Sequence, residues 1–500
     1  MLQFSKVQTY QWLVLILIGL LVTFFSRSYF YEREFKAFFV ILLGIPLVVI
    51  IGTYFLRHPR FETALQLMMT TLPLTSTFVL NIGLTVRLNY FFAVLAVLFL
   101  LYHRNFLIIR KDFSVTCLHT YYLYALISVF FTLFVPDLEN LTSEGLRGSQ
   151  YRPFIQMLQL SLMMVVFHLI LNYATSVERI VNLCTWIFWS LVLVALYGYY
   201  EFFAFKFGLP FINLVSGPVG VDFDPFIGNT RSLLGMDLPR PRAFMGETQF
   251  LTVYLMFAVP FSYISAIASK NKARRRLKLL LFLSFCLLFF LTNARSGLLA
   301  LAVAALVSAF ISRNFKFKLL AFSMFLFSIF AVGYWMHERL VALQLSASDI
   351  AALLHVFFLA RENFLSDAIS VFLVNPIFGV GIGNFIFYID RSLLFSSKAM
   401  VPTSGSVYAN VFSELGLIGL SIFLLFLGTI FHRLRRLVRN PPDSMTRTIA
   451  FAALFSFVGT MTCLVAVSGL YSDSHIWVLW ALCIAVSRQT TSFASGISPP

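Results

Sequence analysis

Residues 277–312 read LKLLLFLSFCLLFFLTNARSGLLALAVAALVSAFIS, which is two apolar stretches separated by a short polar turn. A helix needs roughly 20 predominantly apolar residues, with about 17 at the lower limit, to cross the hydrocarbon core of a bilayer. Because backbone N–H and C=O groups find no water inside lipid, such a stretch must satisfy its own backbone as a helix. The segment therefore predicts two membrane-spanning helices joined by a tight turn at one membrane surface.

The same pattern recurs along the whole 500-residue chain. Hydrophobic residues make up 59% of it and charged residues 12%, with a mean hydropathy of +0.87. Soluble domains carry about 25% charged residues, so the composition excludes a soluble globular protein. We expect an all-α polytopic membrane protein of about fourteen transmembrane helices, since that many stretches approach the required length. They lie near residues 8–25, 37–56, 63–86, 89–103, 114–135, 154–175, 179–206, 248–269, 277–293, 295–312, 317–335, 406–432, 447–469 and 473–488.

Alternate loops along the chain are strongly basic. Lys and Arg gather at 57–60, 104–111, 270–278, 313–318 and 433–447. The positive-inside rule makes these loops cytoplasmic, which with an even number of spans places both termini in the cytoplasm. The net charge of +16 then reflects membrane orientation. No Lys/Arg run is interleaved with stacking aromatic residues, so nucleic acid is not an expected partner.

The remaining loops are predicted to face the outside. The longest of them mark the boundaries between five regions of the chain. We expect N-terminal transmembrane helices over 1–206, a core transmembrane region with an outer loop over 207–335, a large outer loop over 336–405, C-terminal transmembrane helices over 406–488 and a disordered tail over 489–500. Within the large loop, residues 337–372 form an apolar run broken by charges, which predicts amphipathic helices. The five cysteines fall in or beside apolar spans, so we expect neither a disulfide nor a metal site.

Arginines on the outer side are the first candidates for chemistry. Arg240 and Arg242 lie in the sequence RPRAFMGET, where a loop meets the start of the span at 248–269. Free N–H groups at a helix start add to the arginines, so this place suits an anion. The alternative is a pair of interfacial arginines that reach lipid headgroups. Arg295 lies in the turn of the opening segment, on the side where the positive-inside rule disfavours arginine, and is a functional candidate for that reason.

Two further motifs occur, one within the large loop and one in the span that follows it. Residues 375–385 read NPIFGVGIGNF, with glycines at alternate positions. We expect a tight turn where backbones pack closely; a nucleotide loop is disfavoured because no strand precedes it. Glu414 lies roughly 12–15 Å beyond the start of the next span, at 1.5 Å per residue. A carboxylate at that depth needs a partner or stays protonated, so structural pairing and catalysis are both open.

The outer arginines favour a ligand with phosphate at headgroup depth. Guanidinium groups match phosphate oxygens bidentately and do not lose their charge. A lipid-linked pyrophosphate fits, with its lipid between the spans and its phosphates against the arginines. No Asp/Glu cluster offers a Mg²⁺ site, and no cofactor is expected.

These motifs resemble the O-antigen ligase and O-antigen (Wzy-type) polymerase superfamily, which are membrane glycosyltransferases of the GT-C type. The likeness rests on Arg242 and Glu247 before a span, on LTNARSGLLALAVAAL with Arg295, on NPIFGVGIGNF, and on VYANVFSELGLIGL after a long loop. The resemblance implies a GT-C-like fold in the bacterial inner membrane with a long periplasmic loop. It also implies transfer of a glycan from an undecaprenyl-pyrophosphate carrier to an acceptor on the periplasmic side, without metal or nucleotide.

The resemblance assigns roles to individual residues. Arg242 and Arg295 would hold the pyrophosphate and stabilise it as a leaving group, which is an electrostatic role. The residues expected to assist or to contact substrate are Arg240, Arg361, Ser406, Tyr408 and Glu414. The implied partners are the undecaprenyl-pyrophosphate-linked oligosaccharide and membrane lipid, with a chain-length regulator of the pathway as a candidate.

The chain departs from the ligase pattern in one place. Ligases carry a histidine upstream of a Glu-x-Gly element, and counting back from Glu414 puts Gly405 and Ser406 there. This favours the polymerase side of the superfamily or a relative for exopolysaccharide. Glu247 is then the candidate general base, directly or through water. The alternatives are a lipid-linked oligosaccharide flippase and a non-enzymatic assembly protein, and the gathering of arginines at one face favours the enzyme.

Overall fold

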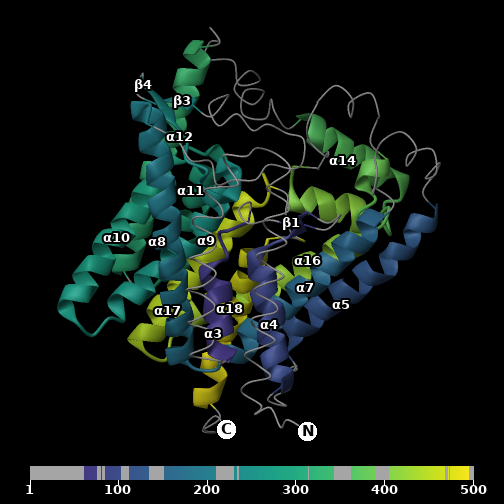
Figure 1. Ribbon diagram of the computed structural model, residues 1–500, viewed down its shortest axis with the longest axis horizontal. Helices are drawn as coiled ribbons and strands as arrows, with labels where there is room; N and C mark the ends of the chain where they lie inside the picture. Colours follow the sequence, from purple (N-terminus) through teal and green to yellow (C-terminus); the bar gives the residue numbers. More distant parts are fainter. Residues whose placement is uncertain are drawn as a thin grey trace, which may run out of the picture.

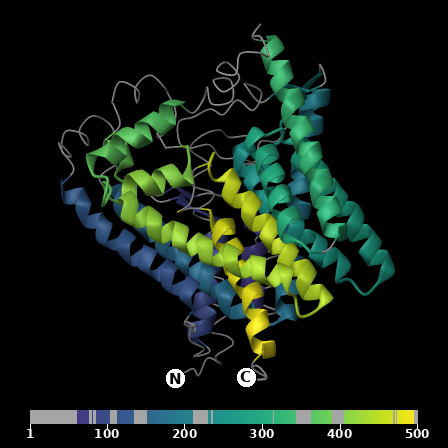
Figure 2. The same ribbon diagram turned by 180° about the vertical axis from the view of Figure 1, so that it is seen from behind.

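The computed structural model is a bundle of helices (Figures 1 and 2). It describes residues 61–75, 80–81, 85–102, 112–134, 151–209, 230–233, 236–313, 315–342, 362–388, 405–467, 471 and 473–494. Strands occur in this part only as two hairpins, β1 (Leu80–Asn81) with β2 (Thr85–Val86) and β3 (Thr230–Leu233) with β4 (Met236–Pro239). Six of the described helices are long and apolar enough to cross a membrane, and shorter apolar helices accompany them. The chain is a multi-pass membrane protein, as its composition predicts.

Most predicted spans correspond to one helix each. The helices are α3 (Phe61–Thr70), α4 (Leu88–Tyr102), α5 (Phe113–Ser128) with the 3-10 turn η1 (Val129–Phe134), α7 (Arg152–Tyr173), α8 (Val177–Phe207), α9 (Thr248–Ile267), α10 (Lys272–Leu291), α11 (Arg295–Ile311), α12 (Phe315–Ala342), α14 (Glu362–Val374), α16 (Val407–Arg439), α17 (Ser444–Cys463) and α18 (Ser474–Ala494); two further 3-10 turns are η3 (Ala243–Met245) and η4 (Phe385–Phe387). Every predicted span from 89–103 onward is confirmed as a helix. The predicted spans 8–25 and 37–56 lie outside the described residues.

The predicted span at 63–86 is wrong as a single membrane crossing. Helix α3 ends at Thr70, and a turn over Thr71–Thr75 leads toward the β1–β2 hairpin. Pro73 accounts for the end of the helix, because proline has no N–H to donate and its ring clashes with the preceding turn. Apolar composition alone did not reveal this break.

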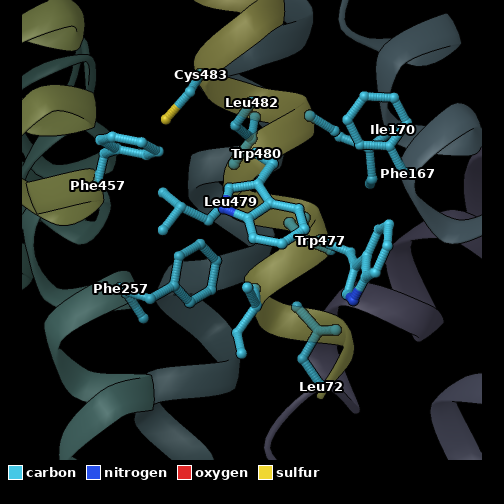
Figure 3. Packing of buried hydrophobic residues seen from close by; sticks show 14 of the residues in the cluster. Leu72, Phe167, Ile170, Phe257, Phe457, Trp477, Leu479, Trp480, Leu482 and Cys483 are labelled. Atoms are coloured by element: carbon cyan, nitrogen blue, oxygen red, sulfur yellow. The ribbon is translucent and has the colours of Figure 1, made fainter. Parts of the chain in front are cut away.

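Helix α18 occupies the centre of the bundle, surrounded by other helices (Figure 3). All its residues from Ser474 to Ser487 are buried, so it is enclosed on every side. The Trp477 and Trp480 rings meet edge to face with centroids 5.0 Å apart, and Trp480 contacts Phe426 of α16 in the same way at 5.1 Å. Such aromatic pairs add to the energy of area burial. By contrast, α10 and α12 carry many exposed Leu and Phe side chains, as helices that face lipid do.

The two ends of the bundle differ in what they carry. The α9–α10 and α16–α17 connections lie together at the lower end in Figure 1, whereas α14 and the β3–β4 hairpin lie at the upper end. The basic segments 270–278 and 433–447 belong to those lower connections. That this end is cytoplasmic stays a prediction of the positive-inside rule. We refer to the opposite end as the outer end.

Helix α16 is broken at the outer end, at Gly416. This residue has φ 62° and ψ −165°, far from helical values. A break leaves helix N–H and C=O groups without their usual partners. The segment after α14 supplies them: the Leu417 and Ile418 amides donate to the carbonyls of Pro376 and Ile377, at 2.9 and 3.2 Å. The two chain segments thus complete one another's backbone hydrogen bonds.

The glycines of NPIFGVGIGNF make this contact sterically feasible. Gly379, Gly381 and Gly383 all have positive φ values, of 76°, 95° and 80°. The Gly381 amide donates to the Glu414 carbonyl at 2.8 Å. A Cβ on Gly379 would collide with the backbone of Glu414, and one on Gly383 would meet the backbone of Pro153. The predicted tight turn with close backbone packing is confirmed, and only glycine combines both properties.

The replacement Gly379→Ala tests this contact. A non-glycine residue in the left-handed region costs about 1–2 kcal/mol before any clash, and the added methyl group also collides with backbone that cannot rotate away. We expect a clear fall in the melting temperature of the detergent-solubilised protein. The matched control is Gly428→Ala, because Gly428 lies in α16, the helix that Gly379 packs against, with open space at its Cβ position. Equal melting temperatures for Gly379→Ala and Gly428→Ala would contradict the packing described here.

Candidate functional site

The segment that leads from β4 into α9 is held between two helices at the outer end. Arg240 donates from Nε to the carbonyl oxygen of Thr292 at 2.9 Å, which ties it to the α10–α11 turn. Two residues later, the Arg242 side chain and backbone bind Glu201 of α8. Alternate residues of this short segment are therefore fixed to different elements. The local sequence Pro239-Arg-Pro241 favours this extended course, because proline restricts the residue before it to extended conformations.

Thr292 connects the α10–α11 turn to Arg240 and to α9. Its hydroxyl accepts from Thr252 of α9 at 3.0 Å and donates to the Phe289 carbonyl at 2.7 Å. The turn then passes through Asn293, whose φ of 44° is left-handed, and Arg295 begins α11. The structure thus joins Arg240 and the turn that carries Arg295 through a direct hydrogen bond.

Glu201 is the residue that sequence reasoning missed. It is buried at 1% exposure in α8, and its Oε2 accepts from the backbone N–H groups of Arg242 at 2.7 Å and Ala243 at 2.8 Å. Its Oε1 accepts from Arg242 Nε at 3.1 Å, forming a buried ion pair. The available signal was a single carboxylate in the aromatic stretch LYGYYEFFAF, since an ionisable residue inside an apolar span is a functional candidate by default.

Two buried polar atoms at this place have no hydrogen-bond partner among the described residues. One is Nη2 of Arg242, whose side chain is only 6% exposed. The other is Oγ1 of Thr248, the first residue of α9. Buried polar groups are nearly always satisfied by protein or by bound molecules. The unsatisfied Nη2 of Arg242 makes this segment a candidate anion site.

Glu247 directly precedes α9 and makes no hydrogen bond to cap it. Its carboxylate is partly buried, and this desolvation raises the pKa of Glu247 above its ordinary value. A glutamate at this position that does not cap the helix is free to serve another purpose, because a capping side chain would be committed to the amides of the first turn.

Glu414 has the buried surroundings that a carboxylate inside a span requires. The Tyr471 hydroxyl donates to its Oε2 at 3.3 Å. The backbone of Gly383 and Phe385 bonds to it as well, and Arg152 supplies an opposite charge. Of the two roles left open by the sequence, these contacts favour structural pairing, because a hydroxyl, backbone groups and an opposite charge all surround the carboxylate.

An apolar cavity of about 470 Å³ lies between α9, α10, α11, α12 and α17. Phe289 and Phe290 form part of its lining and belong to the last turn of α10, directly before Thr292. Leu255 and Leu301 line it from α9 and α11. Its volume is typical of ligand pockets, and its almost wholly apolar walls suit a hydrocarbon chain.

Comparison with known families identifies part of the chain. Residues 279–424 match the model of the O-antigen ligase family, Wzy_C. The chain contains an O-antigen ligase domain. Members of this family are ligases and polymerases, membrane enzymes of surface polysaccharide assembly. No curated protein matches the chain.

The O-antigen ligase domain holds only part of the candidate site. Arg295, the glycine turn and Glu414 fall inside residues 279–424, whereas Arg242 and Glu247 precede them. The domain therefore receives its second group of arginines from the β4–α9 segment, which is anchored to it at Thr292.

Of three further predicted substrate-binding residues in the domain, two make contacts within the bundle and one is not described. Ser406 caps α16 by accepting from the Ala409 amide at 3.4 Å. Tyr408 donates its hydroxyl to the Met461 carbonyl at 3.1 Å, which ties α16 to α17. Arg361 lies outside the described residues. Substrate contact by these three stays a prediction.

The pH dependence of stability tests the burial of Glu247. Because its pKa is raised in the folded protein, the folded state binds this proton more tightly than the unfolded chain does. The resulting stability is fully present below the ordinary glutamate pKa and is lost as pH rises through the raised value. We expect Glu247→Gln to raise the melting temperature at neutral pH, with a gain that shrinks toward zero in acid. Glu178→Gln, on the exposed first turn of α8, controls for loss of a charge. A gain for Glu247→Gln that is constant with pH would contradict the assignment.

Proposed function

We propose that the protein is a membrane glycosyltransferase that polymerises, or transfers, glycan from an undecaprenyl-pyrophosphate carrier on the periplasmic face of the bacterial inner membrane. The observation that carries the proposal is the orphaned Nη2 of Arg242, on the segment that leads into α9, a helix that also lines the apolar cavity. The O-antigen ligase domain supplies the family context. A pyrophosphate attached to a long hydrocarbon chain matches both the arginines, which suit its phosphates, and the apolar cavity, which suits its chain.

The proposed role of the arginines is to stabilise the departing pyrophosphate. The acceptor hydroxyl oxygen attacks the anomeric carbon, and the bond from that carbon to the carrier's phosphate oxygen breaks with its electron pair going to the oxygen. Negative charge then grows on the pyrophosphate. Arg242, Arg295 and Arg240 hold fixed positive charge there, which lowers the energy of the transition state more than that of the bound substrate.

Glu247 is the proposed acceptor of the hydroxyl proton. Its burial moves its pKa from the ordinary glutamate range toward the pH at which a base is most effective. It lies five residues after Arg242, so the proposed base and the proposed leaving-group site are both held by the β4–α9 segment. Full transfer activity in Glu247→Gln at normal expression would exclude this role.

The carrier's hydrocarbon chain is proposed to occupy the apolar cavity. Phe289 and Phe290 line the cavity and stand within one helical turn of Thr292, so a chain placed there has its head at the arginines. Polymerase is favoured over ligase because Gly405 and Ser406 occupy the place where ligases of the superfamily carry histidine. In a polymerase, the acceptor is a second lipid-linked glycan.

Purified full-length protein in detergent is expected to lengthen undecaprenyl-pyrophosphate-linked oligosaccharide without ATP, and with EDTA present. The glycan–pyrophosphate bond supplies the free energy, so no nucleotide is needed. Gel analysis of the glycan and quantification of released carrier pyrophosphate measure the reaction. Longer chains in step with released carrier support the polymerase. Movement of unaltered glycan across liposome membranes would instead identify a flippase.

Arg295→Ala is expected to abolish product while leaving the protein folded. The side chain begins α11 at the membrane surface and holds no place in the central core around α18, so truncation removes charge at the site without opening that core. Losing one electrostatic stabiliser of a leaving group typically costs about 10²–10³ in rate. Elution volume and melting temperature report folding, and the lengthening assay reports activity. A wild-type product ladder from this variant would refute the assignment of Arg295.

A further inference from the structure

The ion pair of Glu201 and Arg242 poses a physical question, because a carboxylate beside an anion site opposes the anion. Both residues are almost fully buried, with side-chain exposures of 1% and 6%. A negative charge at hydrogen-bonding distance from Arg242 cancels much of the arginine's field. If only net charge mattered here, Glu201 would weaken binding.

The geometry of the pair gives the answer. Glu201 approaches the guanidinium from the side, at Nε, and does not take the two terminal nitrogens as an end-on pair does. The terminal Nη2 keeps its donors, is buried, and has no partner among the described residues. Side-on pairing thus fixes the direction of the guanidinium plane and leaves its far end for a ligand.

The same carboxylate also fixes the backbone. Its Oε2 accepts from the amides of Arg242 and Ala243. Ala243 has φ 48°, a left-handed conformation that is unfavourable for alanine and persists only when its surroundings impose it. Phe244 stacks on Tyr197 of α8 with centroids 4.6 Å apart, one helical turn from Glu201. Helix α8 therefore holds the turn in place through a carboxylate and a ring.

We infer that Glu201 is a positioning residue that aims the free end of Arg242 at the pyrophosphate of the substrate. The inference rests on the proposed function, because it assumes that Arg242 binds phosphate. It assigns to α8, which lies outside the matched O-antigen ligase domain, a part in the geometry of the site. Glu201 itself does not contact the substrate.

Replacing Glu201 changes anion binding in opposite directions depending on whether the carboxylate orients Arg242 or only adds negative charge. Removing a negative charge tightens anion binding if net charge decides. It weakens binding if orientation decides, because the guanidinium then adopts several directions and the strained turn relaxes. The probe is inorganic pyrophosphate, bound by full-length protein in detergent and measured by calorimetry. We expect Glu201→Gln to weaken the affinity about tenfold or more, the factor for one charge-assisted hydrogen bond.

Glu201→Asp provides a test at constant charge. It withdraws the carboxylate by one methylene group, so we expect weaker binding of pyrophosphate although the net charge is unchanged. This variant also keeps the inference testable if Glu201→Gln does not fold. Asp112→Asn is the matched control, because Asp112 is a buried carboxylate paired with Arg433 and Arg488 at the other end of the bundle. It is expected to lower the melting temperature without changing the affinity.

A double-mutant cycle shows whether Glu201 acts through Arg242. Lysine at position 242 keeps the charge but has no Nε donor in a planar fork. In an Arg242→Lys background, Glu201→Gln is expected to weaken binding little further, so the two effects are strongly non-additive. Additive effects, or unchanged or tighter binding in Glu201→Gln alone, would overturn the inference. Wild-type protein that does not bind pyrophosphate would overturn the proposed function together with it.

Discussion

Backbone groups that meet no water must be satisfied by protein, and at Gly416 this constraint decides how the outer end is built. Helix α16 breaks there, and its exposed amides and carbonyls bond to the turn at 376–381. Irregular backbone at membrane depth is tolerated only where it is buried in protein in this way. The contact fixes α14, the glycine turn and Glu414 relative to one another. Within the described residues, this part of the outer end is therefore held by backbone hydrogen bonds between two chain segments.

Two buried carboxylates at this end face arginines, and the difference between them is informative. Around Glu414, a tyrosine hydroxyl, backbone groups and Arg152 leave a network whose parts stabilise one another. Around Glu201, backbone amides and Arg242 Nε satisfy the carboxylate, but the arginine retains a buried nitrogen without a described partner. The first arrangement is complete by itself, whereas the second, in the proposed function, is completed by the substrate's phosphate. Burial and charge alone do not distinguish them; the count of unused donors does.

The central core and the arginine-bearing segment depend on different kinds of contact. Helix α18 is enclosed and packs through Trp477 and Trp480. The site is held by polar contacts among α8, the β4–α9 segment and the Thr292 turn. The apolar cavity lies between helices of the same half, and Phe289 and Phe290 of its lining directly precede that turn. A lipid-linked substrate would thus meet hydrocarbon walls and fixed donors within one helical turn, which is the arrangement that the proposed chemistry needs.

The sequence by itself determined the membrane class and the helices from residue 88 onward, because the length of an apolar stretch is a local property of the chain. It also determined the arginine-bearing turns and the close packing of the glycine turn, since positive-inside bias and glycine spacing are local as well. It did not determine the end of α3, where Pro73 interrupts an apolar run. Only the tertiary structure decided that Glu201 binds Arg242, since the two are 41 residues apart and neither changes the local pattern of the other. It likewise decided where the cavity lies, because a void is a property of five helices together. Pairings and voids depend on how distant faces meet, and no local pattern encodes that.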